Sequence, residues 1–186
     1  QKIRPTHSGL WIGFGMGPTY SWINCKTCGP PVAGNPWEGG TGVGISLEMG
    51  GTPRPNLLLG GEVNGWTHFT GLSSGDTPER EADVYSANLV VRYYPTSAQR
   101  LYAKGGIGLS FIELVKPPEE NDEGLVLEAE GWSLQAGLGY DVPIGKVGLN
   151  PFVTFVQMLG HGTPVESGDL TISAPDNASY LIFGVG

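Results

Sequence analysis

The stretch Asp83–Leu114, DVYSANLVVRYYPTSAQRLYAKGGIGLSFIEL, contains two long segments of alternating polarity joined by a short turn. The positions of one face are mostly apolar: Tyr85, Ala87, Leu89, Val91 and Tyr93 in the first half, and Leu101, Ala103, Ile107, Leu109 and Phe111 in the second. Successive side chains of a strand point to opposite faces. The alternation therefore predicts a β-hairpin with one apolar face.

The opposite face of this hairpin is polar and includes the charged residues Arg92 and Lys104. A soluble sandwich encloses its apolar face and exposes its polar face. A membrane barrel does the reverse, with apolar residues toward lipid and polar residues toward the lumen, over strands of about ten residues. Aromatic residues near strand ends, such as Tyr93, also fit a membrane interface. The hairpin therefore favours a membrane barrel.

The composition fits one β-barrel domain over residues 1–186. Gly occurs 31 times and Pro 15 times, which disfavours helix. No window approaches the ~18 consecutive apolar residues of a transmembrane helix. The mean hydropathy of -0.07 is also low, because lipid-facing and lumen-facing residues of a barrel cancel in any average. A net charge of -8 without clustered Lys or Arg argues against nucleic acid as a partner.

The same alternation recurs along the chain. We predict further strands at Gly9–Gly17, Thr41–Gly50, Leu57–Phe69, Glu130–Val142, Val147–Leu159 and Ala178–Gly186. The connections between strands alternate between long and short, as in bacterial outer-membrane barrels. The expected fold is all-β: an eight-stranded antiparallel up-and-down transmembrane-type β-barrel with long loops at one end and short turns at the other. Side chains fill the interior of a barrel of this size, so no open channel is expected.

Four charged residues fall on the lumen side of neighbouring strands, namely Glu48, Glu62, Arg92 and Lys104. Each lies a few residues from its short turn, and at roughly 3.3 Å per residue the four should stand at similar heights. Two acids and two bases balance, as a narrow interior requires, because an unpaired buried charge is costly. We predict one lumen ionic network, which either fills the barrel or gates protons or small ions.

Cys25 and Cys28 lie in a Gly- and Pro-rich segment as C-K-T-C. We favour a disulfide in the first outer loop, since an exported protein meets an oxidising compartment. A redox-active pair would need a helix N-terminus or a nearby base, and neither is evident. A zinc site would need two more ligands, and the histidines His7, His68 and His161 are scattered. We therefore predict neither a metal nor another cofactor.

Other chemistry has weaker support. The acidic loops, Thr70–Ala82 and Val115–Ala129, are typical of solvated faces, although they would also suit divalent cations that bridge lipopolysaccharide. A lipid-modifying enzyme would need a nucleophile and a base. The only candidate pairing is His68 with Ser73 or Ser74. We therefore expect no enzymatic activity and no catalytic residue.

The pattern resembles the small outer-membrane barrel domains of the OmpA, OmpX and opacity-protein type. The resemblance rests on Arg92–Pro95 (RYYP), Lys104–Gly108 (KGGIG), Leu134–Asp141 (LQAGLGYD) and Asn150–Val153 (NPFV). It implies an eight-stranded barrel with a plugged polar interior and surface loops that serve adhesion, envelope or recognition roles. The given sequence ends at Gly186 without the closing aromatic residue of those barrels, which leaves two alternatives open: the native chain extends beyond Gly186, or the barrel assembles in another way.

The leading hypothesis is a non-enzymatic barrel of the bacterial outer membrane that displays its loops for envelope integrity or recognition. We expect lipid around the apolar belt and a surface partner at the loops. The chain begins at Gln1 without a basic and apolar leader, so we expect that a signal peptide has been removed. Two alternatives stay open: a narrow pore, and a secreted barrel whose belt packs against identical subunits in a fibre or shell.

Overall fold

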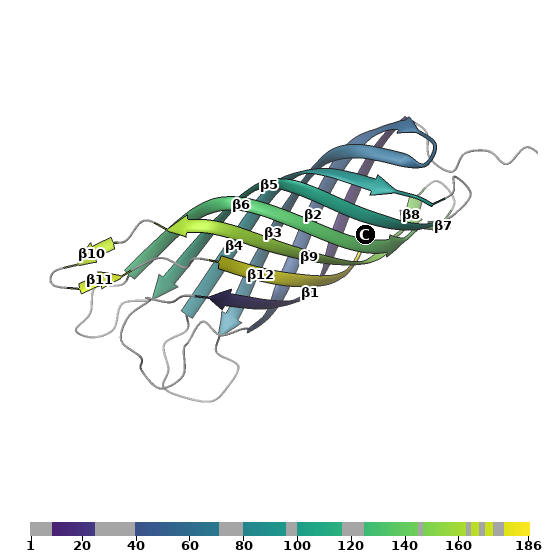
Figure 1. Cartoon of the computed structure of the whole chain (residues 1–186). Helices are drawn as coiled ribbons and strands as arrows, with labels where there is room; N and C mark the ends of the chain where they lie inside the picture. The colour runs from purple at the N-terminus through teal and green to yellow at the C-terminus, as the bar shows by residue number, and fades with distance from the viewer. Residues whose placement is uncertain are drawn as a thin grey trace, which may run out of the picture.

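The computed structural model describes residues 9–24, 40–70, 80–95, 100–116, 125–144, 147–162, 165–167, 170–172 and 177–186. Within these ranges, eight antiparallel strands close into a barrel (Figure 1). They are β1 (Leu10–Asn24), β2 (Gly40–Arg54), β3 (Leu57–Thr70), β4 (Arg80–Tyr93), β5 (Leu101–Lys116), β6 (Leu125–Tyr140), β9 (Pro151–Gly162) and β12 (Asn177–Val185). The predicted fold class is confirmed.

Neighbours in the barrel are neighbours in sequence, and β1 closes the sheet by pairing with both β2 and β12. Two small hairpins lie outside the barrel sheet: β7 (Val142–Ile144) with β8 (Val147–Leu149), and β10 (Val165–Ser167) with β11 (Leu170–Ile172). The β7–β8 hairpin and Gly186 lie at the end that carries the short turns, and the β10–β11 hairpin lies at the opposite end (Figure 1). Among the residues described, no helix has the length and apolar character needed to cross a membrane.

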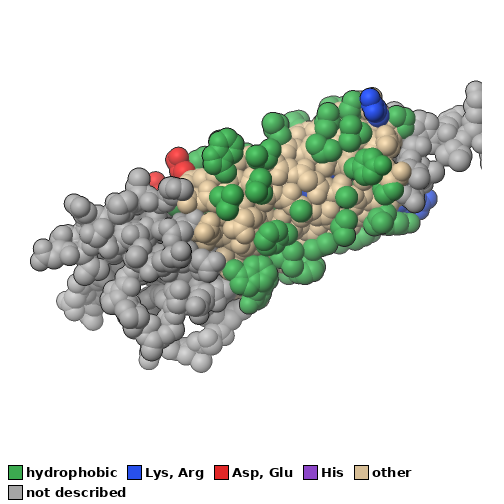
Figure 2. All heavy atoms as spheres, viewed as in Figure 1, with side chains coloured by type: hydrophobic (Ala, Val, Ile, Leu, Met, Phe, Trp, Pro, Cys, Tyr) green, Lys and Arg blue, Asp and Glu red, His purple; other side chains and the backbone are tan. Residues whose placement is uncertain are grey.

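The outer wall is apolar, as the alternation predicts (Figure 2). On β4, for example, Leu89 is 75% exposed, whereas its neighbour Asn88 is buried. Exposed aromatic side chains near the long-loop end are Tyr20, Trp22, Tyr85 and Trp132, and those near the short-turn end include Tyr93 and Tyr140. The barrel thus presents an apolar surface bordered by aromatic rings.

Several predicted strand boundaries are wrong. The first strand does not end at Gly17 but continues through Pro18 to Asn24. Proline has no N–H to donate. The β1–β12 ladder pairs Met16 with Val185 and Thr19 with Ile182 but leaves out Gly17 and Pro18. The missing donor therefore falls at a gap in the ladder.

The strand predicted at Val147–Leu159 is wrong at its start. Val147–Leu149 forms β8 and pairs with β7, and the barrel strand β9 begins at Pro151. The predicted strand Glu130–Val142 runs instead from Leu125 to Tyr140, so Val142 lies in β7 and not on the barrel wall. Val142 pairs with Leu149 in this local hairpin, so neither residue extends a barrel strand.

The acidic segments predicted as loops are partly strand. Lys116 pairs with Leu125, and Glu113 pairs with Glu128, so β5 and β6 continue beyond the predicted ends. Likewise β4 begins at Arg80, and the β10–β11 hairpin lies between the predicted strands Val147–Leu159 and Ala178–Gly186. Acidic residues occur both in solvated loops and on the exposed face at the end of a strand. The acidic composition alone therefore does not distinguish the two.

Candidate functional site

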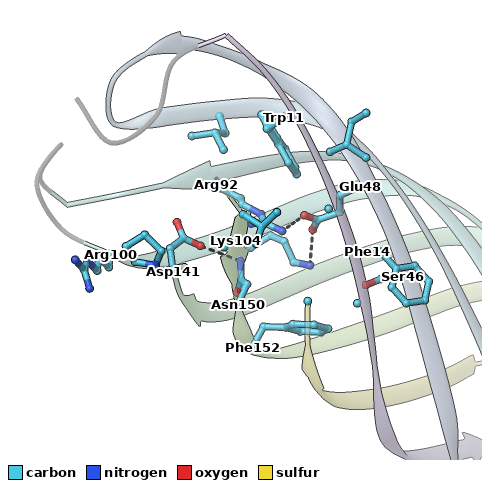
Figure 3. Close-up of a pocket in the computed structure, with 18 of the residues that line it drawn as sticks. Trp11, Phe14, Ser46, Glu48, Arg92, Arg100, Lys104, Asp141, Asn150 and Phe152 are labelled. Atoms are coloured by element: carbon cyan, nitrogen blue, oxygen red, sulfur yellow. Dashed lines mark hydrogen bonds and ion pairs between the residues drawn. The ribbon is translucent and has the colours of Figure 1, made fainter. Parts of the chain in front are cut away.

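Three of the four predicted lumen residues, Glu48, Arg92 and Lys104, lie together inside the barrel close to its short-turn end (Figure 3), and Glu62 contacts Lys104. Lys104 Nζ lies 2.9 Å from Glu48 Oε1 and 2.8 Å from Glu62 Oε1. Arg92 forms an ion pair with the second oxygen of Glu48. Three of the four residues are buried and Arg92 is nearly so. The side chains of β2, β3, β4 and β5 thus form one ionic cluster.

The strand register places like charges side by side in this cluster. Glu48 is directly opposite Glu62 on β2 and β3, and Arg92 is directly opposite Lys104 on β4 and β5. Like charges in such positions destabilise a sheet. The two glutamates and the two basic residues neutralise each other. This allows four charges to be buried in an interior where an unpaired charge would cost several kcal/mol.

A layer of uncharged polar groups continues from the cluster toward the long-loop end. Gln135 Nε2 donates to Glu62 Oε2 at 2.6 Å, and Asn64 Nδ2 donates to Gln135 Oε1 at 3.3 Å. Asn88 Nδ2 donates to Ser86 Oγ at 3.1 Å, and Ser86 Oγ lies 3.0 Å from the hydroxyl of Tyr180. Asn64 Nδ2 also donates to Ser86 Oγ at 3.5 Å, so the polar interior is connected from the cluster to Tyr180.

An apolar layer fills the interior beyond this polar layer. Its buried members are Trp66, Val84, Ile112, Ala129, Val156, Met158, Ala178, Tyr180 and Ile182. The rings of Trp66 and Tyr180 are stacked, with centroids 6.1 Å apart. The sequence places Val156 and Met158 on the lumen side, but an apolar lumen face is an ambiguous pattern in a membrane strand. The structure shows that these residues pack against apolar partners from other strands.

A cavity of about 470 Å³ lies between the ionic cluster and the short-turn end (Figure 3). Its lining residues include Trp11, Ser46, Glu48, Arg92, Arg100, Lys104, Asp141, Asn150 and Phe152. Of these residues, only Glu48, Arg92 and Lys104 belong to the lumen network predicted from the sequence. Their inward positions follow from strand alternation, but the space they surround depends on side chains from distant strands.

Hydrogen bonds order the mouth of this cavity. The Tyr94 hydroxyl donates to Asp141 Oδ2 at 2.7 Å, and Asn150 Nδ2 donates to Asp141 Oδ1 at 2.9 Å. Burial and the bond to Asp141 raise the pKa of Tyr94, the residue after β4, above its ordinary value. The phenol therefore stays protonated and keeps donating to Asp141.

The Arg92 guanidinium is held between two aromatic rings. Its Cζ lies 4.7 Å from the centroid of Trp11 and 4.6 Å from that of Tyr102. Two buried N–H groups here, Trp11 Nε1 and Arg92 Nε, have no hydrogen-bond acceptor among the described residues. A buried donor without an acceptor costs about 1–3 kcal/mol. The cavity wall thus has donor capacity that the protein itself does not use.

The other predicted site residues fall largely outside the described residues. This is the case for the predicted disulfide partners Cys25 and Cys28, and for His7, Ser73 and Ser74. His68 and His161 lie on β3 and β9, but only their backbone is described. In the part of the chain that is described, no group of three or more His, Cys, Asp or Glu side chains is arranged to hold a metal ion.

The comparisons with known proteins identify the fold. No protein-family model matches the chain, and no curated protein matches its sequence. The crystal structure of Ail, the attachment invasion locus protein of Yersinia pestis, is similar with a TM-score of 0.59 and 11% identity, covering 96% of this chain and 97% of that one. Neisserial surface protein A is similar with a TM-score of 0.51 and 8% identity, covering 94% and 96%. The chain therefore has the fold of the small eight-stranded outer-membrane barrels, which confirms the resemblance.

Proposed function

We propose that this protein is a non-enzymatic barrel of the bacterial outer membrane that anchors and displays the long connections at one of its ends. The observation that carries the proposal is the outer face of β4. It begins with Tyr85 and ends with Tyr93, and Ala87, Leu89 and Val91 lie between them. The nine residues from Tyr85 to Tyr93, five of which face outward, match the roughly 9–11 residues of a tilted transmembrane strand.

The surrounding strands support the same assignment. Leu47 on β2, Ile107 on β5 and Leu138 on β6 are all exposed on the outer wall. Such a continuous apolar surface is unfavourable in water and marks contact with lipid or protein. Rings of aromatic residues at both borders favour lipid, because Trp and Tyr prefer the membrane interface.

The interior supports a closed barrel rather than a pore. The charges of the ionic cluster are paired with one another, and a layer of buried side chains around Trp66 and Tyr180 lies beyond the polar layer. An apolar constriction opposes the passage of water and ions. If the interior is closed, the long outer connections are the parts that contact a partner. Their role would then be envelope integrity or recognition. The similarity to Ail concerns the fold and brings no attachment partner to this chain.

Cell fractionation tests the proposal. We expect the protein in washed outer membranes, released only by detergent. An epitope inserted in segment 71–79 should be accessible on intact cells, whereas one between Arg54 and Leu57 should be reached only after the cells are opened. Recovery of detergent-free assemblies would instead support a secreted barrel that packs against identical subunits.

A further inference from the structure

The cavity at the short-turn end is suited to a small molecule. Its volume of about 470 Å³ falls within the range of roughly 300–1,000 Å³ that is usual for ligand sites. Trp11 and Phe152 form apolar walls, and Glu48, Arg92 and Lys104 lie at the inner end (Figure 3). The lining by Pro143, Val147 and Gly186 places the opening at the short-turn end.

The space beside the ionic cluster is left open at Gly13 of β1, whereas Gly15 packs closely against Ser46 and Phe152. Gly13 and Gly15 belong to the lining. A Cβ atom built on Gly13 would have its nearest contacts at 3.9 Å, one of them Glu48 Oε2, so no side chain fills the volume beside the ionic cluster at this position. Access to the cluster from the opening is therefore not blocked by the β1 wall.

The buried lining groups that lack a hydrogen-bond or ion-pair partner include N–H donors. Both oxygens of Asp141 accept hydrogen bonds, from Tyr94 and Asn150, and Lys104 is held by the two glutamates. Glu48 Oε2 has no hydrogen bond but is ion-paired with Arg92. Among the buried N–H donors of the lining residues, Trp11 Nε1 and Arg92 Nε have no acceptor within the described residues.

We propose that this cavity binds a small organic anion with a flat apolar body, such as an aromatic carboxylate, that enters from the short-turn end. The carboxylate would accept from Arg92 Nε and Trp11 Nε1, and the apolar body would lie against Phe152. Because Trp11 and Tyr102 clamp the guanidinium, the donor is already positioned before a ligand arrives. The proposal rests on the interior geometry and not on the membrane that the barrel occupies.

Three compounds of one shape and different charge test it: benzoate, benzamide and benzylamine. Each is titrated into the whole ¹⁵N-labelled chain in an uncharged detergent, and the amide resonances of Gly13 and Gly15 are followed. We expect saturable shifts with benzoate and an affinity at least about tenfold above that for benzamide, since hydrogen bonds to a charged group are the stronger ones. Equal or tighter binding of benzamide or benzylamine would overturn the proposal, as would the absence of saturation with all three.

Two variants remove one donor each. Trp11→Phe keeps an aromatic ring, and Arg92→Lys keeps the charge that neutralises Glu48. Each should weaken the binding of benzoate at least about threefold, and the binding of benzamide by a smaller factor, because a neutral carbonyl oxygen accepts the same hydrogen bonds less strongly. The matched control is Arg54→Gln, an exposed charge at the same end that does not line the cavity. Benzoate affinity unchanged in both donor variants, with amide spectra that show a folded barrel, would contradict the assignment.

Discussion

Glu48 and Glu62 face each other across the β2–β3 ladder, and one ammonium group, that of Lys104, lies within 3 Å of a carboxylate oxygen of each. Adjacent carboxylates in a sheet repel one another. Their coexistence therefore depends on Lys104 and Arg92, which reach them from β5 and β4.

Lys104→Met should destabilise the barrel by about 3–5 kcal/mol, because it leaves buried negative charge without its partner. Urea unfolding in lipid vesicles measures the loss. The double variant Glu62→Gln, Lys104→Met removes one charge of each sign and should recover most of it. Wild-type stability in the single variant would show that the cluster contributes nothing to folding.

Charge on the outer wall should be costly only at the centre of the belt. Leu47 pairs with Phe14 and Val63 in the middle of β2, whereas Leu10 begins β1. In a bilayer, Leu47→Arg should cost about 2–4 kcal/mol and Leu10→Arg about 0–1 kcal/mol. The free energy of folding into vesicles gives both values. Equal costs at the two positions would argue that the belt does not face lipid.

The apolar layer, and not the ionic cluster, should close the barrel. We expect the wild type to be silent in planar bilayers and the double variant Trp66→Ala, Tyr180→Ala to conduct, because its stacked rings fill the layer. The control Glu48→Gln, Arg92→Gln removes a balanced ion pair and should stay silent. Conductance in this control together with a silent Trp66→Ala, Tyr180→Ala variant would assign the barrier to the cluster, and conductance of the wild type would favour a narrow pore.

Replacement of Gly139, on the inner wall, should cost more than replacement of Gly105, on the outer wall. A Cβ on Gly139 would overlap the ring and hydroxyl of Tyr102, whereas one on Gly105 has its nearest atom at 4.0 Å. Gly139→Ala should cost about 1–3 kcal/mol through overpacking, and Gly105→Ala should stay within about 0.5 kcal/mol. Urea midpoints compare the two. Equal midpoints would mean that Tyr102 moves aside freely.

Strand direction and the facing of side chains could be predicted from the sequence. The alternation that places Leu89 outward also places Arg92 and Lys104 inward, because a β-strand has a side-chain period of two. Strand ends were harder to predict. Pro18 looks like a strand terminator, and Glu128 looks like part of a loop, yet both lie in strands because partners across the ladder accommodate them.

By itself, the sequence determined the fold class and the two faces of the wall, since alternating polarity is a local property that each strand carries independently of its neighbours. Only the tertiary structure decided how the interior divides into the cavity, the ionic cluster, the polar layer and the apolar layer. The stacking of Trp66 on Tyr180 and the bridge from Lys104 to Glu48 join residues far apart in the chain. Their contact depends on the closure and register of the barrel, which place side chains of different strands at one height.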